Sequence, residues 1–255
     1  MNLLKKSIKT KNKNKNNVIH TTYNKIIEKK TSYIPEGIQI KALLTNLKQN
    51  WLVFVVGIAC TYILSKTQSI SYYVVIYSFF IASLFGYLIH VLAHKIPSMT
   101  KWILSHDNNN MLMRNTVVRA ILIQISKIVD FHATTHHDSN INNSLVNMVK
   151  EFFNNLAMQA GILWLIKVIL TNISNSIIFM WGLIYTTNHI INYSFVKPIT
   201  HQQHHVNAST NYGVDIYDII FGTKYEWTNI EFGNHATINL VVLTGLFVFV
   251  YTQLN

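Results

Sequence analysis

Histidines are the residues in this chain whose spacing could do chemistry. Eight of the twelve histidines fall into three short clusters: His90 and His94; His132, His136 and His137; and His201, His204 and His205. On a helix, residues three or four positions apart lie on one face, about one turn from each other. Each cluster can therefore present imidazoles to a common point. Three such clusters in one chain predict metal binding.

The number of imidazoles narrows the choice of metal. Cys60 is the only cysteine, so neither a thiolate metal site nor a disulfide framework is available. Zinc sites need three or four protein ligands and a haem needs two, whereas eight or nine imidazoles suit two first-row ions with open positions. We therefore expect two iron ions and dioxygen chemistry.

The composition indicates where these histidines are held. Of the 255 residues, 50% are hydrophobic and only 12% are charged, which is far fewer charges than in an ordinary soluble domain. The apolar residues gather in five segments: 51–64, 70–92, 158–170, 176–193 and 238–254. Only the second comfortably reaches the roughly 20 residues that a bilayer span needs, and the others are short spans or re-entrant hairpins. Tight links predict two helical hairpins, one from the first two segments and one from the next two.

Charge gives the expected orientation. Eleven lysines precede residue 50, in a polar Lys/Asn run that we interpret as a topogenic tail and not as a nucleic-acid-binding arm. If this tail is cytosolic, the cytosolic side also contains residues 95–151 and 197–235, in addition to residues 1–48. Of the 21 Lys and Arg residues, only Lys66 and Lys167 then lie outside the cytosolic segments. All three histidine clusters then lie on one side of the membrane. We expect an all-α integral membrane helical bundle with a histidine-rich metal-binding cap on its cytosolic face.

The wider sequence around the clusters resembles a known family. The stretches "HVLAH", "HATTHH", "NHIINY" and "HQQHHVNASTNYGVDIYDIIFGT" are similar to the histidine boxes of the fatty acid hydroxylase and sterol desaturase superfamily. The stretch from His201 to Thr223 is the most specific, and the resemblance covers residues 51 to about 225. Two features depart from the family pattern: the gap from His94 to His132 is longer, and Tyr217 replaces the usual tryptophan.

The resemblance implies a membrane enzyme with a di-iron centre that hydroxylates or desaturates a fatty acyl or sterol-like lipid with dioxygen. Its metal ligands would be His90, His94, His132, His136, His137, His189, His201, His204 and His205. No fused haem domain is evident, so a separate donor, such as a haem cytochrome or its reductase, would supply electrons. The expected location is the endoplasmic reticulum or an equivalent membrane, with the active site facing the cytosol.

These observations predict three parts of the chain. Residues 1–48 form a basic polar tail, of which residues 1 to about 35 are expected to be mobile. Residues 49–235 form a membrane domain similar to the fatty acid hydroxylases, and residues 236–255 form a C-terminal apolar segment.

The sequence also suggests roles for the isolated histidines and for residues next to the clusters. His20, His106 and His235 stand alone in polar stretches and are expected at the surface. Of the four aspartates beside the boxes, one or two are expected to accept a hydrogen bond from the outer ring nitrogen of a ligand, and the rest to serve as caps or turns: Asp130, Asp138, Asp215 and Asp218. The "NYG" stretch with Gly213 predicts a turn that returns the chain over the site.

Two other classes of protein remain open. A zinc-dependent membrane hydrolase would need fewer ligands and a carboxylate general base, as in HExxH, which this sequence lacks. A non-catalytic metal-binding or transport protein would more often place ionisable residues in the middle of the bilayer than at one face.

Overall fold

The computed structural model describes residues 36–95, 98–105, 114–132, 136–137, 145–167 and 172–254, and all of the regular secondary structure in these residues is helical. This confirms the all-α prediction. The chain divides after Lys41 into two units, and Ala42–Asn255 carries all of the described histidines. Residues 1–35, for which a mobile tail was predicted, lie outside the described residues, and helix α2 (Ile38–Gln49) follows them.

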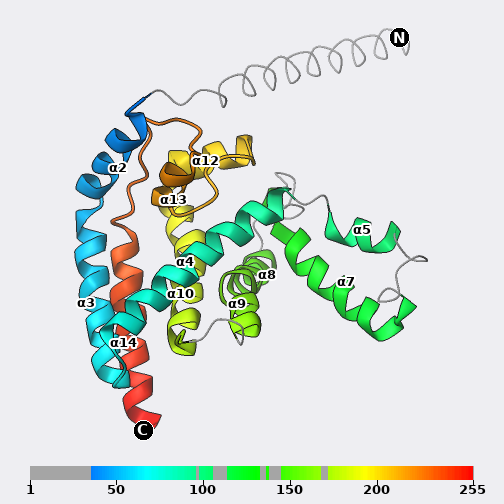
Figure 1. Cartoon of the computed structure of the whole chain (residues 1–255), viewed down its shortest axis with the longest axis horizontal. Helices are drawn as coiled ribbons and strands as arrows, with labels where there is room; N and C mark the ends of the chain where they lie inside the picture. Colours follow the sequence, from blue (N-terminus) through cyan, green and yellow to red (C-terminus); the bar gives the residue numbers. More distant parts are fainter. Residues whose placement is uncertain are drawn as a thin grey trace. The chain divides into compact units, whose positions relative to one another are not determined.

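Among the described residues, three helices are long and apolar enough to cross a membrane: α3 (Trp51–Gln68), α4 (Tyr72–Lys95) and α14 (Ala236–Leu254). Large apolar side chains such as Val55, Phe80 and Phe249 are exposed on all three. A helix satisfies its own backbone hydrogen bonds, so apolar exposed faces of this kind suit lipid better than water. The α3 and α14 helices pack side by side (Figure 1).

The first predicted hairpin is confirmed. Helix α3 ends at Gln68 and is capped by Ser69, which has a left-handed backbone (φ 53°) and whose N–H bonds the carbonyls of Lys66 and Ser65. The chain then turns into α4, which packs against α3.

The second hairpin is interrupted by π-helical turns. Its first arm consists of α8 (Leu145–Leu156), η2 (Ala157–Gly161) and α9 (Ile162–Ile166). Its second arm consists of α10 (Asn175–Thr187), η4 (Asn188–Asn192) and α11 (Tyr193–Val196). The arms pack closely, because a Cβ added to Gly182 would lie 2.6 Å from the Ala160 Cβ. None of the α-helices in these arms reaches the length of a candidate span.

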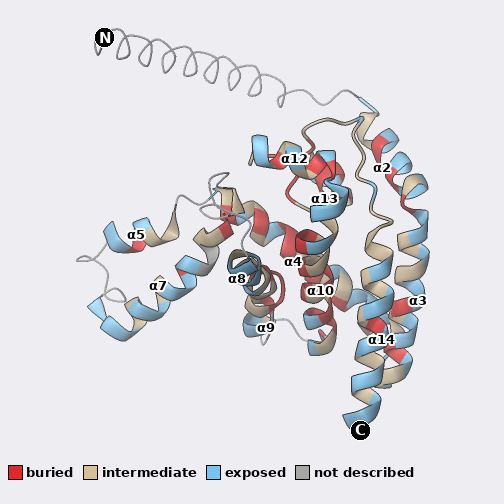
Figure 2. Cartoon of the chain, turned by 180° about the vertical axis from the view of Figure 1, so that it is seen from behind, coloured by how far each residue is buried: buried red, intermediate tan, exposed pale blue. Residues whose placement is uncertain are grey.

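Four further helices complete the described part of the chain. They are α5 (Met99–Ser105), α7 (Thr116–Phe131), α12 (Ile199–Val206) and α13 (Asp215–Phe221). Asp130 positions α5 against α7, since its carboxylate accepts hydrogen bonds from the backbone N–H groups of Met99 and Thr100, both at 2.9 Å. Figure 2 shows buried residues concentrated in α4, α10, α12 and α13, while α5, α7 and α14 are more exposed.

Candidate metal centre

The structure brings eight of the nine predicted ligands into two groups. The first, here called the five-histidine group, contains His90, His94, His132, His137 and His204; the second, the three-histidine group, contains His136, His189 and His201. Within each group the potential ligand nitrogens all lie within 4.8 Å of one another. Imidazole–metal bonds of about 2.0–2.1 Å would place nitrogens on opposite sides of one ion roughly 4 Å apart. Both groups are therefore compact enough to hold a metal ion.

The five-histidine group is assembled from three parts of the chain. The last turns of α4 supply His90 and His94, whose Nε2 atoms lie 3.2 Å apart, as expected for residues one turn apart. His132 follows the end of α7, and its ring centroid is 4.4 Å from that of His90. His204 comes from α12 and is fully buried.

Ring nitrogens in this group are buried without hydrogen-bond partners in the described part of the chain. They are His90 Nδ1, His132 Nε2, His204 Nε2 and both ring nitrogens of His137. Burying polar atoms without partners costs free energy, and a metal ion would satisfy them. The ring nitrogens of the five-histidine group are therefore suited to bind a metal ion.

Burial also keeps these imidazoles neutral. It lowers the pKa of His204 to about 3, and it lowers the pKa values of His132 and His137 as well, with the neighbouring histidines adding to the effect. A neutral imidazole has a free lone pair on one nitrogen. The group is thus in the form that binds a metal at neutral pH.

The three-histidine group lies beside the first one. His189 sits in the π-helical turn η4, a feature frequent at functional sites, and its Nε2 atom lies 3.1 Å from His136 Nε2. His201 comes from α12, and its ring centroid is 4.7 Å from that of His189. The ninth predicted ligand, His205, is exposed and adjoins this group, with its Nε2 atom 3.1 Å from His201 Nε2.

A carboxylate that the sequence did not single out serves this second group. Glu151 Oε1 on α8 lies 2.6 Å from His136 Nδ1 and 3.7 Å from His189 Nε2. Since His136 Nε2 faces His189, Glu151 holds the opposite ring nitrogen and orients the imidazole. Glu151 is the only acidic residue in the apolar stretch 145–167, which is the signal that could have identified it.

Asp215 and Asp218 are not among the one or two aspartates expected to accept a hydrogen bond from a histidine, because their carboxylates bond other groups. Asp215 forms an ion pair with Lys224 and accepts a hydrogen bond from Asn46. Asp218 accepts hydrogen bonds from the N–H of Tyr212 and from other groups of its own loop. A backbone carbonyl serves His204 instead, because its Nδ1 lies 2.6 Å from the Thr210 oxygen. Asp138 lies outside the described residues.

The predicted turn at "NYG" is confirmed. Asn211 has a left-handed backbone (φ 50°), and its side chain donates a hydrogen bond to the Thr200 carbonyl at 3.0 Å. Tyr212 is 1% exposed, and its ring centroid lies 5.9 Å from those of His90 and His204. The turn therefore closes the five-histidine group with an aromatic ring.

His235 does not lie at the surface as expected. It is partly buried, and its Nδ1 atom is 3.2 Å from the Asn192 side-chain nitrogen. Its Nε2 atom is also buried. The residue therefore belongs to the packing between η4 and the start of α14. His20 and His106 lie outside the described residues.

No protein-family model, curated protein or solved structure matches this chain. The class of this protein is therefore defined by its fold and its candidate site alone. It is a helical protein of the membrane type, whose described part contains three candidate spans and two histidine groups that could hold metal ions.

Proposed function

We propose that this protein is a membrane-bound di-iron oxygenase that hydroxylates or desaturates a lipid. The observation that carries the proposal is that two groups of histidines lie next to each other in a protein with membrane-type apolar helices. Five plus three imidazoles, with His205 beside them, exceed what one zinc ion takes and suit two first-row ions. The resemblance of the boxes to the fatty acid hydroxylase and sterol desaturase superfamily supports the same function.

Iron held by the nine histidines would supply the activation of dioxygen. The chain's own residues position the groups around it: Glu151 orients His136, and the Thr210 carbonyl orients His204. Tyr212 covers the five-histidine group and limits access of water to it.

The reaction needs electrons from outside the chain. In hydroxylation, one oxygen atom of dioxygen enters a C–H bond and the other leaves as water, with two electrons and two protons taken up. In desaturation, two hydrogens leave the lipid and both oxygen atoms leave as water, again with two electrons and two protons from the donor. A separate haem cytochrome or its reductase is the proposed donor, and the proposed location is an endoplasmic reticulum or equivalent membrane with the site facing the cytosol.

The test measures metal content and lipid products together. Protein purified from iron-replete cells should hold about two irons per chain, and expressing cells supplied with ¹⁸O₂ should contain a labelled hydroxylated lipid or a new unsaturated lipid. His94→Gln is the matched variant, because it should lower both iron and product. Zinc in place of iron together with hydrolysed lipids would identify a hydrolase, and bound metal with unchanged lipids would identify a non-catalytic protein; either would overturn the proposal.

A further inference from the structure

A cavity of about 240 Å³ lies against both histidine groups. Three of the histidines line it: His90, His189 and His201. Substrate pockets are concave, mostly apolar and supplied with a few convergent polar groups. The position of the cavity beside the candidate metal centre makes it the place where a substrate would be held.

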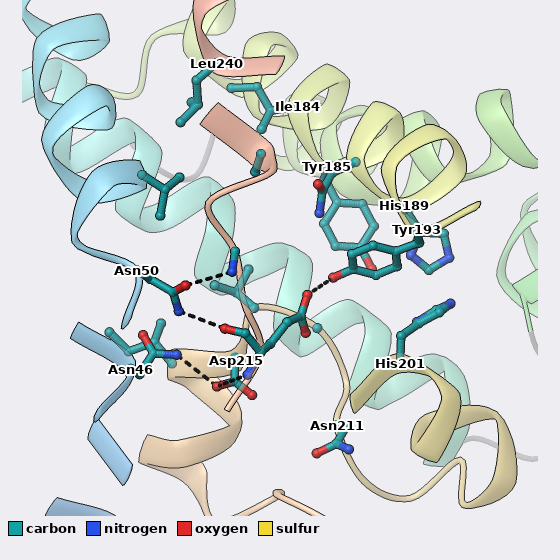
Figure 3. A pocket seen from close by; sticks show the side chains of 18 of the residues that line it. Asn46, Asn50, Ile184, Tyr185, His189, Tyr193, His201, Asn211, Asp215 and Leu240 are labelled. Atoms are coloured by element: carbon teal, nitrogen blue, oxygen red, sulfur yellow. Dashed lines mark hydrogen bonds between the residues drawn. The ribbon is translucent and has the colours of Figure 1, made fainter. Parts of the chain in front are cut away.

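One end of the cavity is apolar. Figure 3 shows Ile184 and Leu240 at this end, and Val53 also lines the cavity. Val53 and Leu240 belong to α3 and α14, which are candidate membrane spans. Ile184 precedes His189 by five residues, which is about 7.5 Å along an α-helix. The apolar end therefore extends from the histidines along the membrane-type helices and suits a lipid body.

The opposite end is polar and acidic. Asn46 and Asp215 lie there (Figure 3), and the Asn46 side chain donates to the Asp215 carboxylate at 2.9 Å. Glu231 lines the cavity as well, while neither Lys nor Arg occurs among the described lining residues. Lys224, which pairs with Asp215, is not part of the lining. The polar end therefore offers hydrogen-bond acceptors and no cation for an anionic ligand.

The Glu231 carboxylate has room for one more donor. It accepts hydrogen bonds from the Tyr193 hydroxyl on Oε1 and from the Thr200 hydroxyl on Oε2, at 2.8 Å for the latter. Two carboxylate oxygens offer about four acceptor positions, so further positions remain. Burial, together with the negative charge of Asp215, raises the pKa of Glu231 to about 7. Surroundings that oppose the charge of Glu231 would oppose the carboxylate or phosphate of a ligand still more.

Tyr193 links this acidic end to the candidate metal centre. Its ring centroid lies 4.7 Å from that of His201, while its hydroxyl bonds Glu231. A polar group held at Glu231 is thus separated from a predicted metal ligand by the length of one tyrosine side chain. The part of a ligand next to this polar group would therefore face the histidines, and the rest would extend toward Ile184 and Leu240.

We propose that the cavity binds a neutral lipid whose hydroxyl group donates a hydrogen bond to Glu231, so that carbons near this hydroxyl face the histidine groups. If the proposed function holds, the lipid bound in this way would be oxidised close to its hydroxylated end. Only this chemical consequence rests on the proposed function. The binding step itself needs neither dioxygen nor electrons.

The test compares a long-chain alcohol with the fatty acid of the same length. Binding of each radiolabelled lipid is measured to the full-length protein in nanodiscs, without dioxygen or reductant, at about pH 8.5. This pH lies above the pKa of about 7 of Glu231, so its carboxylate is ionised during the measurement. We expect the alcohol to bind about tenfold more tightly than the acid, the size of one hydrogen bond to a charged group. In Glu231→Gln, which removes the negative charge, this preference should fall toward equal binding.

A second pair of variants tests the place of binding. Leu240→Trp should weaken binding of both lipids, because the added ring fills the apolar end, whereas Leu246→Trp on the exposed face of the same helix should leave binding unchanged. Equal or tighter binding of the acid by the unsubstituted protein would overturn the inference, as would equal losses in the two tryptophan variants. The unsubstituted protein decides the first point even if a variant fails to fold.

Product analysis separates this inference from the proposed function. Oxygen or unsaturation introduced nearer the hydroxyl than the methyl end of the alcohol supports the inference, and oxidation at the methyl end overturns it. If the alcohol binds as expected but no lipid is oxidised, the proposed function fails while the binding site stands. If lipids are oxidised but the acid is preferred, the function stands and the inference fails.

Discussion

The two histidine groups lie next to each other but differ in what surrounds them. The five-histidine group consists of imidazoles closed over by Tyr212, and several of its ring nitrogens are buried without partners in the described residues. The three-histidine group has a carboxylate, Glu151, on His136, and two of its members line the cavity. The comparison indicates that one ion would be enclosed by nitrogen ligands, while the other would be held by fewer ligands next to the substrate.

The largest effect is expected from breaking the enclosed group. His204→Ala removes a fully buried imidazole that the Thr210 carbonyl orients, so both oxidised lipid product and bound iron should fall, with activity lost by at least about 100-fold. Iron per chain and product per cell measure this. Full activity of the variant would show that the five-histidine group is not part of the catalytic centre.

A smaller and more selective effect is expected at the carboxylate. Glu151→Gln keeps the shape of the side chain but removes the charge that orients His136, so affinity for one of the two ions should fall roughly 10- to 100-fold. Titration with a chelator should then release one ion before the other. Glu226→Gln is the matched control, because it removes the same charge from a carboxylate that bonds Thr228 and belongs to neither histidine group. Its affinity for both ions should be unchanged. Simultaneous release of both ions in Glu151→Gln would show that the two groups are not distinct.

The sequence predicted the fold more completely than it predicted the surroundings of the site. Helical periodicity and the apolar segments gave the first hairpin, α14 and the placement of His90 and His94 on one helix face, because these are local properties. The gathering of eight described histidines into two groups agrees with the spacing of the boxes. Their roles as ligands, and the orientation in the membrane, stay predictions.

The partners of the histidines could not be predicted, because they depend on tertiary packing. Glu151 on α8 bonds His136 and lies near His189 on η4, against which α8 packs. Asp215, which stands closer to the boxes in sequence, pairs with Lys224. Nearness along the chain therefore favoured the wrong carboxylate. The π-turn at His189 also has no local sequence signal that we can identify.

Packing beneath the three-histidine group offers a third test. Gly182→Ala would place a Cβ 2.6 Å from the Ala160 Cβ and 2.9 Å from Leu156 Cδ1, which forces α10 away from the helix that carries Glu151. We expect a loss of about 1–3 kcal/mol in the free energy of unfolding. Thermal unfolding in detergent measures it. Gly245→Ala is the control, because nothing lies within 4 Å of its added Cβ, and a loss of equal size there would rule out the packing explanation.

The smallest effect is expected at His235, which marks the boundary of the centre. Its imidazole lies beside Asn192, but it belongs to neither histidine group. Asn192 keeps other partners, since its side-chain nitrogen also donates to Asn188 Oδ1 at 3.0 Å and to the His235 carbonyl at 3.1 Å. His235→Ala should therefore cost at most about 1 kcal/mol in the free energy of unfolding and leave iron content unchanged. His189→Ala is the matched variant, because it lies on the same π-turn as Asn192 yet should lower bound iron. Loss of iron in His235→Ala would extend the three-histidine group toward α14, and the cavity would then border a larger centre than the two groups define.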